Sequence, residues 1–149
     1  LGTMGFGMGA AIGAQIATGE RSVLVTGDGS FAMSMNELAT AVTYKVPMVI
    51  MIMNNGVLGM VRQWQTLFYD KHYSATVLNR QTDFVKLAEA FGGAGMCVTT
   101  LEELETALQK AFVYEGPFII DCRIDKDECV FPMLPPGGSM DDIIVKAGN

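Results

Sequence analysis

The sequence predicts a single α/β domain built on a doubly wound, mainly parallel sheet with helices on both faces. Short apolar segments typical of buried parallel strands alternate along the chain with segments whose apolar residues recur at helical spacing. The 149 residues suffice for one well-packed core and are too few for two ordinary domains. Half of the residues are hydrophobic and 17% are charged, which is typical of a globular protein.

The expected strands are apolar, β-branched runs that stop at turn residues. The first, SVLVT, precedes Gly-Asp-Gly, and the second, MVIMIM, precedes Asn-Asn-Gly. The four expected strands cover residues 22–26, 48–53, 95–99 and 118–124.

The expected helices follow from apolar spacing and from residues typical of helix ends. Gly19 is expected to end the first helix, and Ser34 or Asn36 is expected to cap the second. The expected helices cover residues 8–18, 35–45, 58–68, 83–91 and 101–114. The apolar stripe expected on the last helix consists of Leu101, Leu104, Leu108, Ala111 and Phe112.

The expected domain organisation has one boundary. Residues 1–124 are expected to form the α/β domain, shortened at its N-terminus because the chain opens directly on a glycine-rich segment. Residues 125–149 contain three prolines and a Gly-Gly pair, which indicates an irregular tail and a candidate lid over the site.

Composition argues against several classes of function. The formal charge of −6 and a pI near 4.6, without a cluster of Lys and Arg, disfavour nucleic-acid binding. Three cysteines without Cys-x-x-Cys spacing indicate neither a disulfide framework nor a zinc site, and we expect a cytoplasmic protein. The longest apolar run, residues 46–53, is far too short to span a membrane.

Asp28 and Asn55 are the first candidate site residues. Each directly follows an expected strand, and one helix lies between the two strands. Because a right-handed crossover returns the chain to the same edge of a parallel sheet, both side chains should lie on one rim. Open α/β sheets bind their ligands at that rim.

A carboxylate and an amide oxygen suit Mg2+, which prefers oxygen ligands and often shares them with phosphate groups. One negative charge leaves the ion partly uncompensated, which favours a ligand such as a diphosphate. Gly27 and Gly29 flank Asp28 and allow backbone N–H groups to approach phosphate oxygens, and Ser30 adds a hydroxyl.

Together these features resemble the signature of thiamine-diphosphate-dependent enzymes: Gly-Asp-Gly after an apolar strand, then a helix, a second apolar strand and Asn-Asn. Further segments resemble the C-terminal domain of the large catalytic subunits of the acetolactate (acetohydroxyacid) synthase family. These segments are GTMGFG at 2–7, LGMVRQWQTLFYDKHYS at 58–74, DFVKLAEAFG at 83–92 and FPMLPPGGSMDDII at 131–144. The resemblance covers almost the whole chain.

The resemblance implies roles for individual residues. Asp28, the Asn55 side chain and the main-chain carbonyl of Val57 would bind Mg2+. The residues that would line the diphosphate are Gly29, Ser30, Leu58 and Gly59. Met4 would support the bent cofactor, with Gly2 and Met33 at its pyrimidine end. Met60 and Trp64 would lie on the substrate side, where the large apolar indole would pack against the second 2-keto acid.

The resemblance also implies the chemistry and the partners. The enzymes of this family decarboxylate pyruvate and join the two-carbon unit to a second 2-keto acid, pyruvate or 2-ketobutyrate, in branched-chain amino-acid biosynthesis or the acetoin pathway. We expect a homodimer or homotetramer of the full-length chain, with a regulatory small subunit as a further partner. The activating glutamate of the family, and most of the FAD site where FAD is used, belong to other domains. No catalytic residue is therefore assigned here, and the isolated chain is expected to be inactive.

Two alternatives stay open. The chain resembles other thiamine-diphosphate-dependent 2-keto acid decarboxylases and oxidases in its first two motifs. A non-catalytic binding module, such as a receiver-like domain with Asp28 as phosphoacceptor, is the second alternative.

Overall fold

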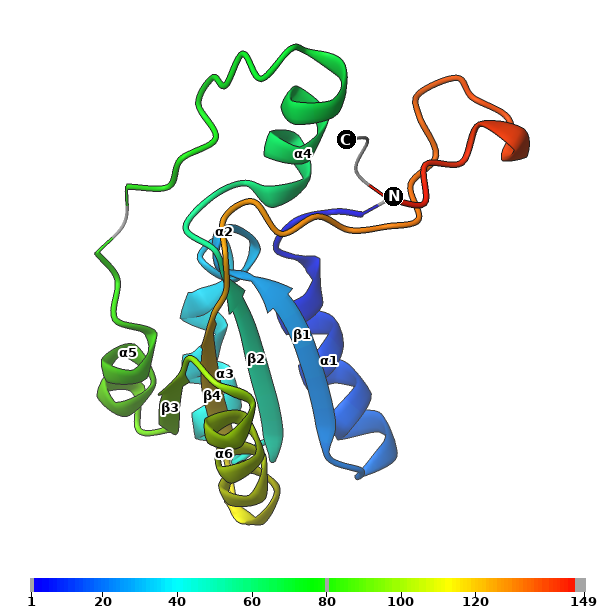
Figure 1. The fold of residues 1–149 in the computed structure, drawn as a ribbon. Helices are drawn as coiled ribbons and strands as arrows, with labels where there is room; N and C mark the ends of the chain where they lie inside the picture. The colour runs from blue at the N-terminus through cyan, green and yellow to red at the C-terminus, as the bar shows by residue number, and fades with distance from the viewer. Residues whose placement is uncertain (1, 80, 147–149) are drawn as a thin grey trace.

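A computed structural model describes residues 2–79 and 81–146 (Figure 1). Four strands alternate with helices along the chain. The strands are β1 (Ser22–Gly27), β2 (Met48–Asn54), β3 (Ala94–Val98) and β4 (Pro117–Arg123). The α-helices are α1 (Phe6–Thr18), α2 (Asp28–Phe31), α3 (Leu38–Thr43), α4 (Gly59–Phe68), α5 (Phe84–Phe91) and α6 (Leu101–Val113), and the 3-10 helices are η1 (Met35–Glu37) and η2 (Met140–Asp142).

The sheet has the strand order β1-β2-β4-β3, and each neighbouring pair is parallel. Ser22 pairs with Met48 at the start of β1 and β2, and Gly27 pairs with Met53 at their ends. The first two strands therefore end at the same level, so that the segments after them begin side by side.

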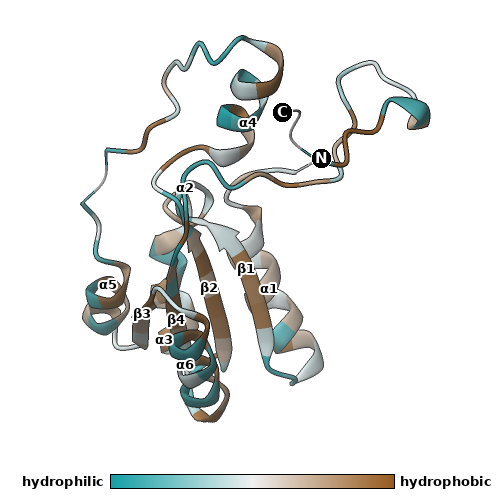
Figure 2. Ribbon diagram, viewed as in Figure 1, coloured by the Kyte–Doolittle hydropathy of each residue, from teal (hydrophilic) through white to brown (hydrophobic). Residues whose placement is uncertain are grey.

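The core has two layers, one on each face of the sheet. On one face, residues of α1, α3 and α5 pack against β2 and β4 around Phe31, Leu38 and Ile50. On the other face, α6 packs through Ala107 and Ala111. Figure 1 shows α1 and α3 behind the sheet and α6 in front of it, and Figure 2 shows that the strands between them are strongly apolar. The predicted doubly wound parallel fold with helices on both faces is confirmed.

Most element boundaries agree with the sequence-based prediction within one or two residues. Gly19 ends α1 in the left-handed conformation, with φ of 72°. Asp83 caps α5 by accepting a hydrogen bond from the Lys86 N–H.

The prediction of one continuous helix over residues 35–45 is wrong. This segment forms the short 3-10 helix η1 followed by α3. Neither Ser34 nor Asn36 caps it with a side chain, because the Glu37 N–H donates to the main-chain carbonyl of Ser34 in a tight turn. Such i to i+3 turns use the donors that a side-chain cap would satisfy.

The predicted apolar stripe on α6 is only partly correct. Leu101 is 79% exposed and Phe112 is half exposed, whereas Ala107 and Ala111 are buried. The helix packs against the sheet through these two small residues, and Leu101 in its first turn does not contribute to the core. Leu104 and Leu108 are partly buried against the core.

The segment after β4 is irregular over the described residues 125–146. It contains η2 and one isolated antiparallel bridge between Met133 and Ile144. Residues 147–149 of the predicted tail lie outside the described residues. Within the described ranges, no helix combines the length and the apolar character needed to cross a bilayer.

Candidate cofactor-binding site

The segments that follow β1 and β2 meet at the C-terminal rim of the sheet. Asp28 begins α2 directly after β1 and is only 4% exposed. Asn55 follows β2, and its Oδ1 accepts a hydrogen bond from the Val57 N–H at 3.1 Å. This turn brings the side chain of Asn55 and the main chain of Val57 together.

One cavity of about 450 Å³ joins these two segments. It brings together ten of the thirteen residues that the sequence assigns to the cofactor and substrate. Those ten residues are Met4, Gly27, Asp28, Gly29, Ser30, Asn55, Val57, Leu58, Gly59 and Met60. The sequence-based grouping of the Gly-Asp-Gly and Asn-Asn segments thus corresponds to a real hollow in the molecule.

Two glycines allow the main chain to approach closely within this hollow. A methyl group added at Gly59 would lie 2.8 Å from Nδ2 of Asn55. A methyl group added at Gly29 would lie 3.0 Å from a side-chain carbon of Leu58 and 3.1 Å from one of Leu78. Both glycines therefore preserve space that any other residue would take.

The segment before α1 is attached to the Gly-Asp-Gly-Ser turn. The Gly5 N–H donates to Oγ of Ser30 at 3.0 Å. Met4 lines the cavity, and its Cε lies 3.5 Å from the position of an added methyl group at Gly29. An apolar side chain therefore extends over the turn that carries Asp28.

Part of the cavity wall comes from α4 and from the segment after β4. Gln63 is buried and pairs with the Val130 main chain: its Nε2 donates to the carbonyl at 2.9 Å, and its Oε1 accepts from the N–H at 2.7 Å. The sequence alone did not indicate several wall residues, which lie outside its motifs or at helix positions without a chemical signature. These are Met53, Val61, Gln63, Ile124, Glu128 and Val130.

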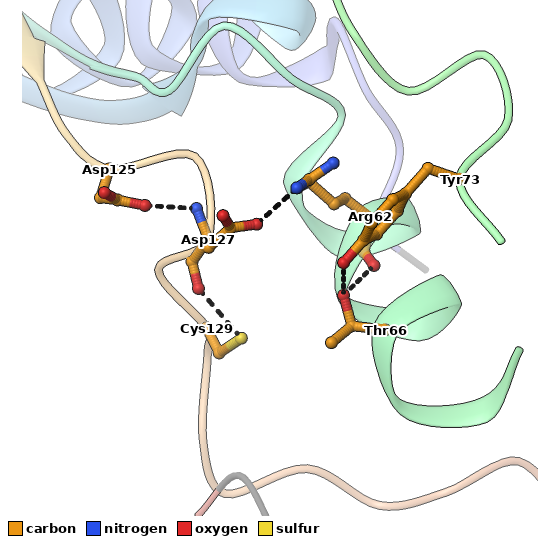
Figure 3. Close-up of polar contacts among 6 residues, drawn as sticks. All are labelled: Arg62, Thr66, Tyr73, Asp125, Asp127 and Cys129. Atoms are coloured by element: carbon orange, nitrogen blue, oxygen red, sulfur yellow. Dashed lines mark hydrogen bonds and ion pairs between the residues drawn. The ribbon is translucent and has the colours of Figure 1, made fainter. Parts of the chain in front are cut away.

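Arg62, the neighbour of Gln63, holds the same segment through an ion pair. Its Nη2 and Nε both lie 2.7 Å from Oδ1 of Asp127, and its guanidinium lies 3.9 Å from the ring centre of Tyr73 (Figure 3). The Tyr73 hydroxyl is 3.1 Å from Oγ1 of Thr66. Helix α4 is thus joined both to residues 125–130 and to the loop that follows the helix.

A second cavity of about 670 Å³ is lined by α4 and by the loop that follows it. Met60 lines both cavities, whereas Trp64 lines the second one only. The Trp64 ring makes an edge-to-face contact with Phe68 at 6.0 Å between centroids. Its Nε1 is buried, and within the described part of the chain it has no hydrogen-bond partner. The two substrate-side candidates therefore share one helix and line one cavity together with other aromatic residues.

Two predicted cofactor residues lie outside both cavities. Gly2 is exposed, and Met33 is 62% exposed beside Gly5. Neither is among the residues that line the candidate site.

The donor set of the first cavity fits a small, oxygen-preferring cation. The lining includes Asp28 and Asn55, whose side chains offer carboxylate and amide oxygens, and also Glu128, and its described part contains no lysine or arginine. Across residues 2–79 and 81–146, no three His, Cys, Asp or Glu side chains gather into a metal site. A cation bound here would therefore need a mixture of carboxylate, amide and main-chain ligands. An anion would need that cation, because the described lining offers no positively charged side chain.

Comparison with known proteins decides the family. Residues 1–122 match the family described as "Thiamine pyrophosphate enzyme, C-terminal TPP binding domain". The chain belongs to this family. The domain of this family binds thiamine diphosphate, also called thiamine pyrophosphate (TPP), and the cavity at the C-terminal ends of β1 and β2 is the candidate cofactor site.

Curated relatives of this TPP-binding domain include large subunits of acetolactate synthase. The Haemophilus influenzae subunit is 46% identical over 146 residues, which are 97% of this chain and 26% of the relative. The isozyme 2 subunit of Escherichia coli is 44% identical over 98% of this chain and 27% of the relative. The probable subunit of Methanocaldococcus jannaschii is 44% identical over 97% and 24%. The chain thus spans about a quarter of the length of these relatives.

A solved structure of another thiamine diphosphate enzyme has the same fold. The 4-hydroxybenzoylformate decarboxylase of Rhodococcus jostii RHA1 superposes with a TM-score of 0.76 at 35% identity. The match covers 82% of this chain and 23% of that one. The parallel sheet and its rim are therefore shared beyond the acetolactate synthases.

Proposed function

We propose that this chain is the diphosphate- and magnesium-binding part of a thiamine-diphosphate-dependent acetolactate synthase. The full-length enzyme would be a transferase that decarboxylates pyruvate and joins the two-carbon unit to a second 2-keto acid. The observation that carries this proposal is the single cavity that unites the Gly-Asp-Gly-Ser turn with the Asn-Asn-Gly-Val-Leu-Gly turn. Identities of 44–46% to acetolactate synthase subunits, against 35% to a decarboxylase, favour the synthase.

In this proposal Mg2+ binds to Asp28, to Oδ1 of Asn55 and to the carbonyl of Val57. The ion supplies the positive charge that the cavity lining lacks, and thereby holds the diphosphate. Gly29, Ser30, Leu58 and Gly59 line the diphosphate, where the two glycines leave room for close approach.

Thiamine diphosphate, when bound, supplies a ring that accepts electrons from the reacting carbon. The chain's own side chains orient this ring and exclude water. Met4 supports it over the turn of Asp28, and Met60 and Trp64 present apolar surface to the alkyl group of the second 2-keto acid. For Gly2 and Met33 at the pyrimidine end, the resemblance is the only support.

The remaining parts of the proposal concern the full-length protein. Residues 125–149 serve as a lid, which is supported by the attachment of residues 127 and 130 to α4. A glutamate from another domain activates the cofactor, and FAD, if used, binds mainly outside this chain. We further propose a cytoplasmic homodimer or homotetramer that associates with a regulatory subunit.

Product analysis tests the proposed activity. The full-length protein is incubated with pyruvate, thiamine diphosphate and Mg2+, and the products are separated. We expect acetolactate, and with added 2-ketobutyrate also acetohydroxybutyrate. Acetaldehyde or acetyl phosphate as the sole product would instead identify a decarboxylase or an oxidase.

A further inference from the structure

A buried polar layer lies at the rim beside the candidate metal site, and the proposed function does not use it. Asp121 in β4 is 1% exposed, and Asn54 at the end of β2 is 8% exposed. Nδ2 of Asn54 donates to Oδ1 of Asp121 at 2.8 Å. The other carboxylate oxygen, Oδ2, lies 2.8 Å from Nη2 of Arg123, whose side chain is half exposed.

These three residues are placed by the sheet itself. Asn54 pairs in register with Arg123, and Asp121 pairs with Ile52 on one side and Cys97 on the other. Side chains at paired positions project from the same face of a parallel sheet. The polar layer thus lies on the same face as the apolar residues around Ile52 and closes that layer toward the rim.

A buried carboxylate is costly unless it is paired and hydrogen-bonded. The ion pair of Asp121 comes from Arg123 in the same strand, whereas its hydrogen bond forms only when the end of β2 places the Asn54 amide opposite it. Any shift of the β2 end would leave this carboxylate without its amide partner. The pair therefore favours one position of residue 54.

Residue 54 is the last fixed point before the candidate metal ligands. Its carbonyl accepts a hydrogen bond from the Ile124 N–H at 3.2 Å, so main chain and side chain are both held by β4 and its continuation. Asn55 is the first residue after β2, and it lines the cavity whereas Asn54 does not. The Asn55 side chain then holds the Val57 N–H.

We propose that Asn54 and Asp121 are positioning residues for the candidate magnesium ligands Asn55 and Val57 and act through the main chain of residues 54–57. This inference rests on the proposed function, because it concerns the same metal. Arg123 neutralises the carboxylate from the solvent side of the layer. Neither residue of the pair lines the candidate cofactor cavity, so neither is a catalytic residue.

The test is the Mg2+ concentration that half-saturates thiamine diphosphate binding in the full-length protein, measured by calorimetry. N54D places two carboxylates against each other, and we expect it to raise this concentration about tenfold, as is typical when a group behind a metal ligand is lost. N54D/D121N restores one carboxylate, one amide and a neighbouring Arg123, and we expect it to return the value toward that of the wild type. D121N, which leaves Arg123 without its carboxylate, should lie between wild type and N54D.

I119V is the matched control, because Ile119 is fully buried in the same strand two residues before Asp121 and its side chain belongs to the hydrophobic core. It should lower thermal stability without changing the magnesium requirement. A merely structural pair would make N54D behave like I119V, and that result overturns the inference.

If N54D does not fold, the remaining comparison is between D121N and N54D/D121N. The inference predicts that D121N needs a higher Mg2+ concentration for half-saturation than N54D/D121N, and the reverse order overturns it. A wild-type protein that binds no thiamine diphosphate at any Mg2+ concentration overturns the proposed function as well, whereas unchanged variants overturn this inference alone.

Discussion

Gly59 is the residue at which a single methyl group acts most directly on the candidate metal ligands. In G59A the added carbon would lie 2.8 Å from Nδ2 of Asn55 and would push the amide away from its present position. We expect thiamine diphosphate binding by the full-length protein, measured at limiting Mg2+, to weaken about tenfold.

Gly13 in α1 provides the matched control, because an added methyl group there meets no atom within 4 Å. G13A should leave binding unchanged and stabilise the helix by about 0.5–1 kcal/mol, measured by thermal unfolding. Equal cofactor affinity of G59A and G13A would contradict the assigned role of Asn55.

Single residues show which parts of the site a sequence can reveal. Asp28 and Asn55 were predictable because each follows a strand, and parallel strands end on one rim. The contact between Gln63 and Val130 was not predictable, because the two residues are 67 positions apart and Val130 lies in a segment without a periodic apolar pattern. Met33 was assigned to the cofactor by resemblance, yet its side chain lies exposed outside the cavity.

At the scale of elements, α6 has an N-terminal capping box that makes its stability depend on pH. The pKa of Glu103 lies below its ordinary value of 4.5, chiefly because the Thr99 N–H and hydroxyl donate to its carboxylate, with the Thr100 N–H adding to them. Ionised Glu103 therefore stabilises the fold above pH 4.5, and this contribution is lost as the pH falls through the lower value in the folded protein.

E103Q should consequently lower the midpoint of thermal unfolding at neutral pH and approach the wild-type midpoint in acid. E105Q, which alters an exposed glutamate of the same helix, is the control and should show no such convergence. A difference between E103Q and wild type that is the same at neutral and acidic pH would refute this role of the carboxylate.

Helix α4 and the segment after β4 form a connected pair of elements. In Q63A the Val130 N–H loses its acceptor, so its hydrogen exchange should accelerate markedly. Q65A is the control, because Gln65 makes a similar double contact with the main chain of Ser74 in the loop instead. Equal exchange at Val130 in wild type and Q63A would show that Gln63 does not hold the tail.

Elements were more predictable than their packing. The four strands and the longer helices were predicted because a buried parallel sheet requires apolar runs and helical spacing, whereas the short helices α2 and η2 were not predicted. The division of residues 35–45 into η1 and α3 escaped prediction, because main-chain turns after α2 replace the side-chain cap. The exposure of Leu101 escaped it too, because small alanines bring α6 toward the sheet.

At the scale of the whole molecule, the chain presents an open site and an uncovered part of its sheet. Val23 and Val25 on the edge strand β1 are exposed, and the chain spans about a quarter of its acetolactate synthase relatives. We expect the 149 residues alone to produce no acetolactate from pyruvate, because the family resemblance implies that the activating glutamate lies in another domain of the full-length protein. Detectable product from the isolated chain, with the full-length protein as positive control, would contradict this expectation.

The most direct test of the proposed site is calorimetry of thiamine diphosphate with the full-length protein, with Mg2+ and with a chelator, in wild type and D28A. We predict binding by the wild type only when Mg2+ is present, and loss of that binding in D28A, because Asp28 contributes the carboxylate that would hold the ion. Equally tight binding without Mg2+, or unchanged binding by D28A, would contradict a site in which Asp28 and Asn55 share one magnesium ion.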